Sequence, residues 1–547
     1  MSPHDSTGAN LIVQVRQAKV MRVVPMENED VNECWLADRD RFSYEALNGD
    51  QRLTAPMIKH GGEWKTVDWT TALEYVTRGL AHVKRDHGAA SIGALASAHS
   101  TVEELHLLAR LVRGLGSQNI DFRTRHADFA PPAGARWLGT SIASLTNLQR
   151  VLVVGSFLRK DHPLFAQRLR QAAKRGAQIH SLNAVHDDWA LPLAGTITAA
   201  PSQWLRSLAA VAAAVAAAKG VAAPVDARST PEAQRVAESL LSGERKAVLL
   251  GNAAAQHPQA GALLSLANWI GEQTGASVGY LGEAANTVGA QLVDALPGEG
   301  GLNAAQMLAG KLKAAILLNL EPAFDTADPG VAIAGLRKAE TVIVLTPFRD
   351  VALDVADVLL PIAPFSETSG TFVNAEGRVQ SFHGVVRPLG EARPAWKVLR
   401  VLGNMLGLEG FEHESAEEVR QEALPADVAS RLSNRSSAPV ALVPESQDLE
   451  RIADVPIYCT DSLVRRAASL QLTADAAPPV VRLSQAVWQR LGLTNGAKVR
   501  VLQGGAEAVL PARLDPTLAP NAVRVPAGHP DTASLGAMFG PISVAKA

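Results

Sequence analysis

The stretch RVLVVGSFLRKDHPLFAQRLRQAAKRGAQIHSLN, residues 150–183, decides the fold of this chain. It opens with the apolar run Arg150–Gly155, which has the length and composition of a buried strand in a parallel sheet. A loop ending in His-Pro leads into a helical stretch, Leu164–Lys174, and Gly176 separates that helix from a second apolar run, Gln178–Leu182. The order strand, helix, strand predicts a βαβ unit.

The same alternation recurs on both sides of this unit. The expected helices are Trp69–His87, Thr101–Leu115 with a Thr101/Glu104 capping box, Ala260–Thr274, Asp328–Lys338 and Trp396–Leu406. The expected strands are Ser91–Leu95, Lys246–Gly251, Lys313–Asn319 and Thr341–Leu345. Strands alternating with helices of this length predict an α/β fold with doubly wound parallel sheets covered on both faces.

The two ends of the chain lack this alternation of strands and helices, and the sequence therefore predicts four parts. The small β-rich region 1–62 contains short strands at Leu11–Val15 and Val20–Val24, and the α/β body of two interleaved subdomains covers 63–409. Residues 410–454 are rich in Ser, Ala, Glu and Pro and form the expected linker. A β-barrel-like domain is expected at 455–547, with strands at Val480–Leu483, Ala497–Leu502, Ala506–Leu510 and Ala522–Val525.

Composition excludes several classes of protein. The chain has 547 residues, 47% of them hydrophobic and 19% charged, which indicates several ordinary globular cores. A net charge of −2 without a run of Lys and Arg argues against nucleic-acid binding. The opening MSPHDSTGAN lacks the features of a secretory signal. The Ala-rich stretch 208–225 is interrupted by Lys219, Gly220 and Pro224, which favours a packing or surface helix over a membrane span.

The chain has only two cysteines, Cys34 and Cys459. This number excludes a disulfide framework and indicates a cytosolic chain. An iron–sulfur cluster usually takes four thiolates, and a structural zinc site takes several Cys or His at short spacings. We therefore expect each cysteine to be a small buried apolar residue.

The loop GSFLRKDHP, residues 155–163, lies at the carboxyl end of a predicted parallel strand, where open α/β sheets bind ligands. Arg159, Lys160 and His162 are candidates for binding a phosphate. The alternative is a solvated loop that caps the following helix, which is favoured because the loop has one glycine and no GxGxxG pattern.

Two other polar segments have a chemical and a structural interpretation. RTRHAD, residues 123–128, suits either a catalytic His–Asp pair or an ion-pair network in a cleft, and the network is favoured because no nucleophile is evident. ETSGTFVNAEGR, residues 367–378, suits either paired carboxylates for acid–base work or a turn-rich loop whose Glu and Arg hold one another. His180, His186 and His257 lie in separate elements without ligand spacing, so no metal site is predicted.

These segments resemble the molybdopterin-oxidoreductase superfamily over essentially the whole chain. The resemblance rests on residues 150–183, on DVALDVADVLLPIAPFSETSGTFVNAEGRVQSFHGVV at 350–386 and on the closing β region at 481–514. The opening at 2–42 and YCTDSLVRRAASLQLT at 458–473 are similar to the G-subunit family of bacterial NADH:quinone oxidoreductase.

The opening departs from the pattern of catalytic members in this superfamily. Those members bind a 4Fe–4S cluster through four cysteines, the last in a segment resembling Leu36–Phe42, where this chain has Ala37. Cys34 lies three residues too early, and Ser2–Asp5 contains no thiol. The G-subunit family also carries 2Fe–2S and 4Fe–4S clusters on an N-terminal region that we expect to be missing here. The sequence then represents a truncated product, an engineered fragment or one part of a split protein.

The resemblance implies a scaffold in the peripheral arm of NADH:quinone oxidoreductase, or respiratory complex I. Its expected partners are the other peripheral-arm subunits, and it reaches the cytoplasmic side of the inner membrane only through that complex. We expect no cofactor in this chain and no catalytic, cofactor-binding or metal-binding residue. A molybdopterin-dependent oxidoreductase without the proximal cluster is the alternative, with a pterin between the Gly155 and Gly370 loops and Asp128 as metal ligand. A non-functional remnant is the third possibility.

Overall fold

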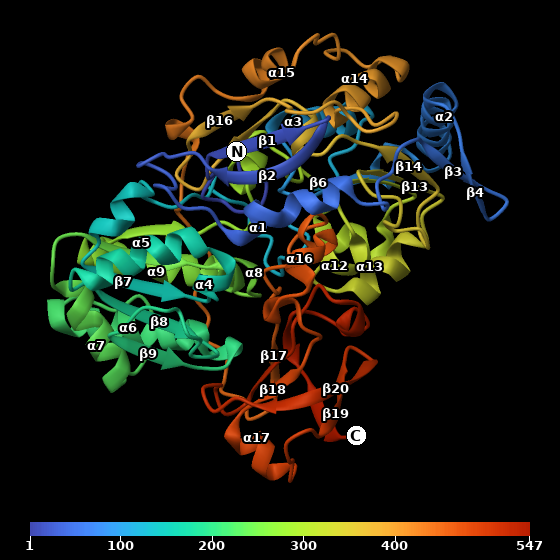
Figure 1. Ribbon diagram of the computed structural model, residues 1–547. Coiled ribbons are helices and arrows are strands. Elements are labelled where there is room, and N and C mark those ends of the chain that lie inside the picture. Colours follow the sequence, from blue (N-terminus) through green and yellow to red (C-terminus); the bar gives the residue numbers. More distant parts are fainter.

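A five-stranded parallel sheet forms one half of the α/β body (Figure 1), and the computed structural model describes residues 1–547. The strand order is β11-β10-β7-β8-β9, and all four strand pairs are parallel. The strands are β7 (Arg150–Val154), β8 (Gln178–Asn183), β9 (Gly195–Thr198), β10 (Lys246–Leu250) and β11 (Ser277–Tyr280). The predicted βαβ unit at 150–183 is therefore confirmed, with β7 and β8 as neighbours.

Alternating side chains of these strands face helices on opposite sides of the sheet, as the two-residue period of a strand requires. Val151 and Val153 of β7 pack with α5, whereas Leu152 and Val154 pack with α6 and α9. The helices of this half are α4 (Leu158–Asp161), α5 (Pro163–Lys174), α6 (Trp204–Lys219), α7 (Pro231–Leu241), α8 (Asn252–Gln256) and α9 (Ala260–Thr274).

A seven-stranded sheet forms the other half, with the order β4-β3-β14-β13-β12-β5-β6. The strands from β14 to β6 are parallel, and the β3–β4 hairpin adds to one edge in antiparallel fashion. The strands are β3 (Met57–His60), β4 (Glu63–Thr66), β5 (Ile92–Ala96), β6 (Ile120–Asp121), β12 (Ala314–Leu318), β13 (Thr341–Thr346) and β14 (Val358–Pro361). The five-stranded sheet is an insertion in this one, because residues 150–280 lie between β6 and β12 in the chain.

Helices again cover both faces of the seven-stranded sheet. Ile343 and Leu345 of β13 pack with α2 and α3, and Val342 and Val344 pack with α13 on the other face. The predicted capping box is confirmed, because the Thr101 hydroxyl accepts from Glu104 N at 3.2 Å and the Glu104 carboxylate accepts from Thr101 N at 2.9 Å. The helices are α2 (Trp69–His87), α3 (Val102–Gly114), α10 (Thr287–Leu292), α11 (Ala304–Gln306), α12 (Pro322–Asp325), α13 (Pro329–Leu336), α14 (Ala395–Met405) and α15 (Ala416–Ala423).

Smaller β elements lie at both ends of the chain. The N-terminal segment forms the β1–β2 hairpin followed by α1, and the C-terminal strands form a curled sheet of order β22-β17-β21-β18-β20-β19-β23, drawn below the body in Figure 1. The first of its strands in the chain, β17, precedes residue 455. The bounds are β1 (Leu11–Arg16), β2 (Lys19–Pro25), α1 (Asp38–Phe42), β17 (Glu450–Ile452), α16 (Ala468–Gln471), β18 (Val481–Leu483), α17 (Gln485–Arg490), β19 (Lys498–Gln503), β20 (Ala506–Leu514), β21 (Ala522–Arg524), β22 (Phe539–Pro541) and β23 (Ser543–Lys546). Within the body, β15 (Gly370–Val373) and β16 (Val379–Phe382) form a separate two-stranded sheet.

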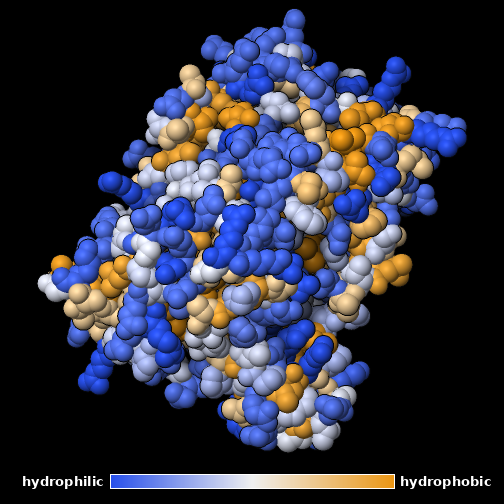
Figure 2. Space-filling model, turned by 60° about the vertical axis from the view of Figure 1, so that its left-hand side comes forward, coloured by the Kyte–Doolittle hydropathy of each residue, from blue (hydrophilic) through white to orange (hydrophobic).

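The Ala-rich stretch forms the packing helix α6, whose Val211 and Val215 are fully buried. Small side chains let this helix lie close to α7 and α9. Among the helices of the structure, none combines the length and the apolar character needed to cross a membrane. Apolar side chains on the face drawn in Figure 2 form separate patches between hydrophilic ones.

Candidate functional site

The carboxyl ends of both parallel sheets face a common interior, the position at which α/β sheets bind ligands. Phe157 follows β7, Asn252 follows β10 and Glu283 follows β11, and all three line one cavity of about 20 Å³. Asn319 after β12 lines a second cavity, of about 60 Å³. His99, which follows β5, lines both cavities. The interior therefore has the topology of a ligand site but holds space for only a few water molecules.

A network of buried ion pairs fills much of this interior. Arg125 binds Glu283 at 2.8 Å and Asp325 at 2.9 Å, and Arg465 binds Asp325 at 3.0 Å and Glu321 at 2.8 Å. The two arginines are buried, so their charges are compensated inside the protein rather than by solvent. Arg465 comes from the segment after β17, so the network also joins the C-terminal part to the body.

The first residues of the chain enter the same interior. His4 is fully buried, its Nδ1 lies 2.8 Å from an Asp461 carboxylate oxygen, and its Nε2 lies 2.7 Å from the Ser43 hydroxyl. Burial opposes a charge on His4, but Asp461 outweighs it and raises the pKa of the imidazole. Burial also opposes the charge on Asp461, and His4 nevertheless lowers the pKa of that carboxyl well below its usual range.

Asp5 and Arg39 form a second buried contact between the opening segment and α1, at 3.1 Å. Arg39 also donates to the Asp161 carbonyl at 2.8 Å. Burial raises the pKa of Asp161 to about 7 and that of Asp40 to about 6. In the enzymes that this chain resembles, the opening segment and the segment of α1 carry the cluster ligands. In this chain the two segments meet through the ion pair between Asp5 and Arg39.

The residues of the 155–163 loop do not converge on one point. Arg159 is exposed and pairs with Asp188, and Lys160 pairs with Asp475. His162 is buried, hydrogen-bonds the Gly282 carbonyl, and has a pKa lowered to about 4 by burial. The structure therefore offers no joint phosphate contact for these three side chains.

Gly155 has a structural role in this loop, and its replacement by alanine provides a test. Its φ is +58°, and an added Cβ would lie 2.6 Å from Ala254 N and 2.8 Å from the Trp204 ring. We expect Gly155→Ala to lower the free energy of unfolding by about 2–3 kcal/mol, measured by urea denaturation. Gly220→Ala is the control, because Gly220 has a similar φ of +66° with open space around it. Equal losses in both variants would contradict the packing role.

The segment 123–128 forms ion pairs rather than a catalytic dyad. Arg123 pairs with Asp121 at 2.9 Å, and Arg125 belongs to the interior network. His126 is neutral near pH 7, because burial lowers its pKa to about 4. Asp128 accepts hydrogen bonds from Gly261 N at 2.7 Å and from Ala130 N at 3.0 Å, so its carboxylate is engaged at the start of α9.

The two carboxylates of the 367–378 segment have separate arginine partners. Glu367 forms a two-pronged ion pair with Arg52, at 2.7 and 2.8 Å. Glu376 binds Arg378 at 2.7 Å and accepts from Ile142 N at 2.7 Å. The turn-rich interpretation describes Glu376 and Arg378, but sequence reasoning missed the distant partner of Glu367.

The remaining candidates stay apart from each other. His257 hydrogen-bonds the Pro201 carbonyl at 2.9 Å and stacks on Trp204, while His180 lies in β8 and His186 follows it. No group of three His, Cys, Asp or Glu side chains has the geometry of a metal site. Cys459 is buried, but the expectation for Cys34 is wrong, because the β2–α1 connection leaves its side chain exposed.

Sequence reasoning also missed a buried pair of acids at the start of α3. Glu103 accepts from the Thr371 hydroxyl at 2.7 Å and from Thr371 N at 2.9 Å, and Glu104 closes the capping box. Burial raises the pKa of each carboxyl to about 7. The capping box signalled Glu104, but an acidic residue in a first helical turn is usually exposed, so nothing marked Glu103.

Comparison with known proteins identifies the class. A family model described as "Molybdopterin oxidoreductase" matches residues 52–405, and one described as "NADH-ubiquinone oxidoreductase NDSU1/NuoG-like, 4Fe-4S domain" matches residues 3–45. The chain belongs to the molybdopterin oxidoreductase family. The resemblance of its sequence to this family and the predicted α/β class are both confirmed.

Particular relatives include complex I subunits and enzymes. The G subunit of NADH-quinone oxidoreductase from Streptomyces coelicolor is 30% identical over 70% of this chain and 50% of its own length. The mitochondrial 78 kDa subunit of NADH-ubiquinone oxidoreductase from Candida albicans is 27% identical, over 74% of this chain and 51% of its own. The chain spans about half the length of these curated relatives. Acetylene hydratase from Pelobacter acetylenicus shares the fold, with a TM-score of 0.74, 15% identity and full coverage of both chains.

These matches correct the expectation that the chain holds no cofactor and that cluster regions lie only outside it. Residues 3–45 match a 4Fe-4S domain, and residues 52–405 match a domain family that binds molybdopterin. The expectation rested on missing thiol ligands, which do not decide the domain families to which the two segments belong. The cluster-domain architecture is preserved in a segment whose cysteine pattern has changed.

The residues in the first matched segment do not fit a cluster with four thiolate ligands. Cys34 is the single cysteine between residues 3 and 45, and its side chain is exposed rather than turned into the interior. Asp5 and Arg39 neutralise one another where the two segments meet. The function that we propose for this chain requires no electron transfer through such a cluster.

The interior does not fit a pterin dinucleotide either. A Cβ on Gly370 would collide with Thr101, and Gly155 is packed against Ala254 and Trp204, so neither loop forms an open cradle. The cavities of about 20 and 60 Å³ fall far below the hundreds of Å³ typical of ligand pockets. The ion-paired side chains of the interior network close this space. They are Arg125, Glu283, Glu321, Asp325 and Arg465.

Proposed function

We propose that this chain acts as a component of the peripheral arm of NADH:quinone oxidoreductase, similar to the G subunit, where it holds neighbouring subunits in position. The observation that carries the proposal is the match of residues 3–45 to a NuoG-like domain, directly followed by the family match at 52–405. The names of the Streptomyces and Candida relatives support it. An interior filled by compensated ion pairs suits a protein that works through its surface.

The proposal includes a place in the cell. The chain reaches the cytoplasmic side of the inner membrane through its partner subunits, and quinone reduction belongs to the assembly. No nucleic acid takes part, in keeping with a net charge of −2.

Co-purification tests this function. The full chain, tagged after Ala547, is expressed in cells that make NADH:quinone oxidoreductase and isolated from gently solubilised membranes. We expect peripheral-arm subunits to co-purify in a fixed ratio and the preparation to oxidise NADH with a quinone acceptor. The same tag on an unrelated α/β protein is the control. A folded chain that migrates alone in native electrophoresis would contradict the proposal.

Membership in the molybdopterin oxidoreductase family supports a second candidate, an oxidoreductase that uses a pterin-bound metal. A relative described as a putative formate dehydrogenase from Staphylococcus haemolyticus, 23% identical, belongs to this class by name. Elemental analysis of the chain from a molybdenum-replete host separates the candidates. Stoichiometric molybdenum or tungsten would support the enzyme and contradict the scaffold.

A further inference from the structure

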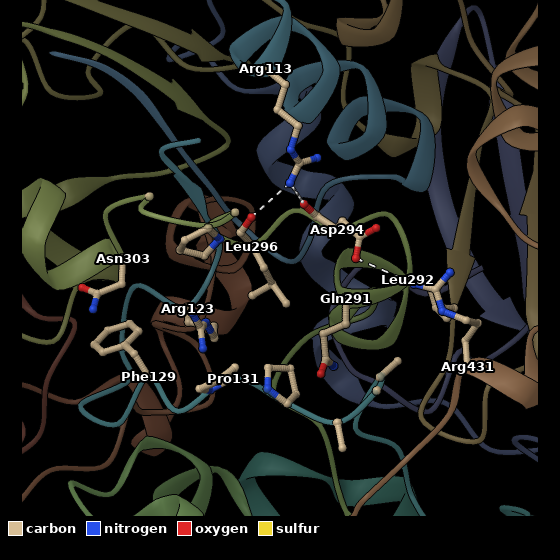
Figure 3. A pocket seen from close by; sticks show the side chains of 17 residues that line it. Arg113, Arg123, Phe129, Pro131, Gln291, Leu292, Asp294, Leu296, Asn303 and Arg431 are labelled. Carbon is tan, nitrogen blue, oxygen red and sulfur yellow. Dashed lines mark hydrogen bonds and ion pairs between the residues drawn. The ribbon is translucent and has the colours of Figure 1, made fainter. Parts of the chain in front are cut away.

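An arginine-lined hollow of about 730 Å³ opens on the surface of the seven-stranded half (Figure 3). Four separate segments build it. Arg113 comes from the last turn of α3, Arg123 follows β6, Asp294 follows α10, and Arg431 ends the short 3-10 turn Ala429–Arg431. Arg123 also borders a small cavity with Asn252 and Glu283 of the interior, whereas Arg113, Asp294 and Arg431 do not.

Arg113 carries a charge that no carboxylate neutralises. Its guanidinium donates to two backbone carbonyls, of Asp294 at 2.6 Å and of Leu296 at 3.1 Å, and forms no ion pair. Burial lowers the pKa of Arg113, against the opposing effect of Asp294. The group nevertheless stays charged near pH 7, because an arginine pKa begins above 12. Asp294 is therefore the acid whose charge acts on this half-buried cation, but it forms no ion-pair contact with it.

The other two arginines each have an acidic partner, and only Arg431 reaches the surface with a loosely held charge. Arg123 pairs with Asp121 and lies over the Phe129 ring, with its carbon Cζ 5.0 Å from the ring centroid. Arg431 is half exposed, and its one ion pair, to Asp294, spans 3.8 Å. The three guanidinium groups thus face two carboxylates in total, and Figure 3 shows them arranged around the open space.

The hollow continues into a neighbouring one of about 800 Å³, and the two share Arg113, Leu292, Asp294 and Arg431. The second hollow carries its own acids, Glu409 and Glu422, and Arg110 pairs with Glu422 there. Arg113 and Arg431 line both hollows, so their positive charge lies where the two hollows meet. The two joined hollows form an open groove, which suits an extended chain better than a compact small molecule, because a small molecule is usually enclosed on most sides.

We propose that this groove binds an acidic segment of a partner polypeptide, with carboxylates of the partner against Arg113 and Arg431. Guanidinium groups bind carboxylates in a planar, two-pronged geometry, and arginine is enriched at protein interfaces. The inference rests on the proposed function and deepens it, since it locates one contact between this chain and a neighbouring protein of the peripheral arm.

Photo-crosslinking in the assembled complex tests the inference. Benzoylphenylalanine is placed at Ala133, an exposed residue that lines the hollow, and at exposed Ala81 of α2 as a remote control. From Ala133 we expect a crosslink to one peripheral-arm protein, within a stretch that carries at least two Asp or Glu residues. A crosslink to a neutral or basic stretch would overturn the inference, and so would the same product from Ala81.

Charge variants provide the second measurement. Arg431→Glu should reduce the Ala133 crosslink about tenfold, equivalent to about 1.4 kcal/mol of binding free energy, and Arg431→Lys much less, because lysine keeps the positive charge. Arg78→Glu is the matched control, since Arg78 is an exposed arginine of α2 paired with Glu74. A crosslink unchanged by Arg431→Glu would overturn the inference.

The two proposals fail in different ways. A wild-type chain that co-purifies with peripheral-arm subunits but yields no crosslink from Ala133 refutes the groove and leaves the scaffold intact. A wild-type chain that joins no complex refutes the scaffold, and the groove proposal falls with it. Displacement of the crosslink by inorganic phosphate at low ionic strength would indicate a small-anion site and contradict the peptide.

Discussion

Glu367→Gln is expected to lower the free energy of unfolding by about 3–5 kcal/mol, because it leaves Arg52 charged and buried without an anion. The side chains of this pair are 1% and 4% exposed, and two nearly parallel hydrogen bonds join them. Arg52 precedes β3 and Glu367 follows β14, so the pair fastens the N-terminal region to the body. Urea denaturation, followed by tryptophan fluorescence, measures the loss.

A double variant separates the buried charge from the shape of the site. Arg52→Met combined with Glu367→Leu removes both charges and keeps similar volumes, so we expect it to recover at least half of the lost stability. Further destabilisation in the double variant would show that the hydrogen bonds of Arg52 to Leu47 O and of Glu367 to Leu389 N dominate instead.

Asp461→Asn is expected to cost about 3–4 kcal/mol at mildly acidic pH, and the loss should depend on pH. The raised pKa of His4 means that the stability from its charge is complete below about pH 6.5 and disappears as the pH rises through the folded-state value. The lowered pKa of Asp461 means that its contribution is complete above about pH 3.9 and is lost as the pH falls through its folded-state value. The pair therefore stabilises most between these limits.

Unfolding measured at about pH 5.5 and about pH 9 tests this dependence. The difference between wild type and Asp461→Asn should be larger at the lower pH. Ser43→Ala is the control, because it removes the other partner of His4 and should cost about 1 kcal/mol without a strong pH dependence. Hydrogen exchange of residues 2–7 should rise in Asp461→Asn. A constant difference across the pH range would refute the charged pair.

The long elements could be predicted from the sequence because their apolar spacing and end signals are local. The bounds of α2 and α9 agree with the expected helices, and β7, β8, β10, β12 and β13 lie where apolar runs predicted strands. The hairpin strands β3 and β4 and the strands β9, β11 and β14 were missed. Each has only four residues, which is too short for its apolar spacing to be distinguished from that of a loop.

The candidate site was harder to predict because its contacts join distant positions. His4 and Asp461 are 457 residues apart, and Arg52 and Glu367 are 315 apart, so no local pattern marks either pair. Sequence reasoning marked the carboxyl end of β7 as a candidate ligand loop but favoured a solvated loop there. It did not show that Arg159 and Lys160 turn to surface acids while the buried arginines come from elsewhere.

The insertion of one sheet within the other has a consequence for synthesis on the ribosome. Strand β5 pairs with β12, so Ile92–Ala96 must wait for Ala314–Leu318 to emerge before its ladder forms. The five-stranded sheet, encoded entirely between them, can complete its own strand pairing first. During that interval the apolar edge of β5 is unpaired, and contacts of such long separation form slowly. The nascent chain is therefore most exposed to aggregation, and most dependent on chaperones, while residues 150–280 are folding.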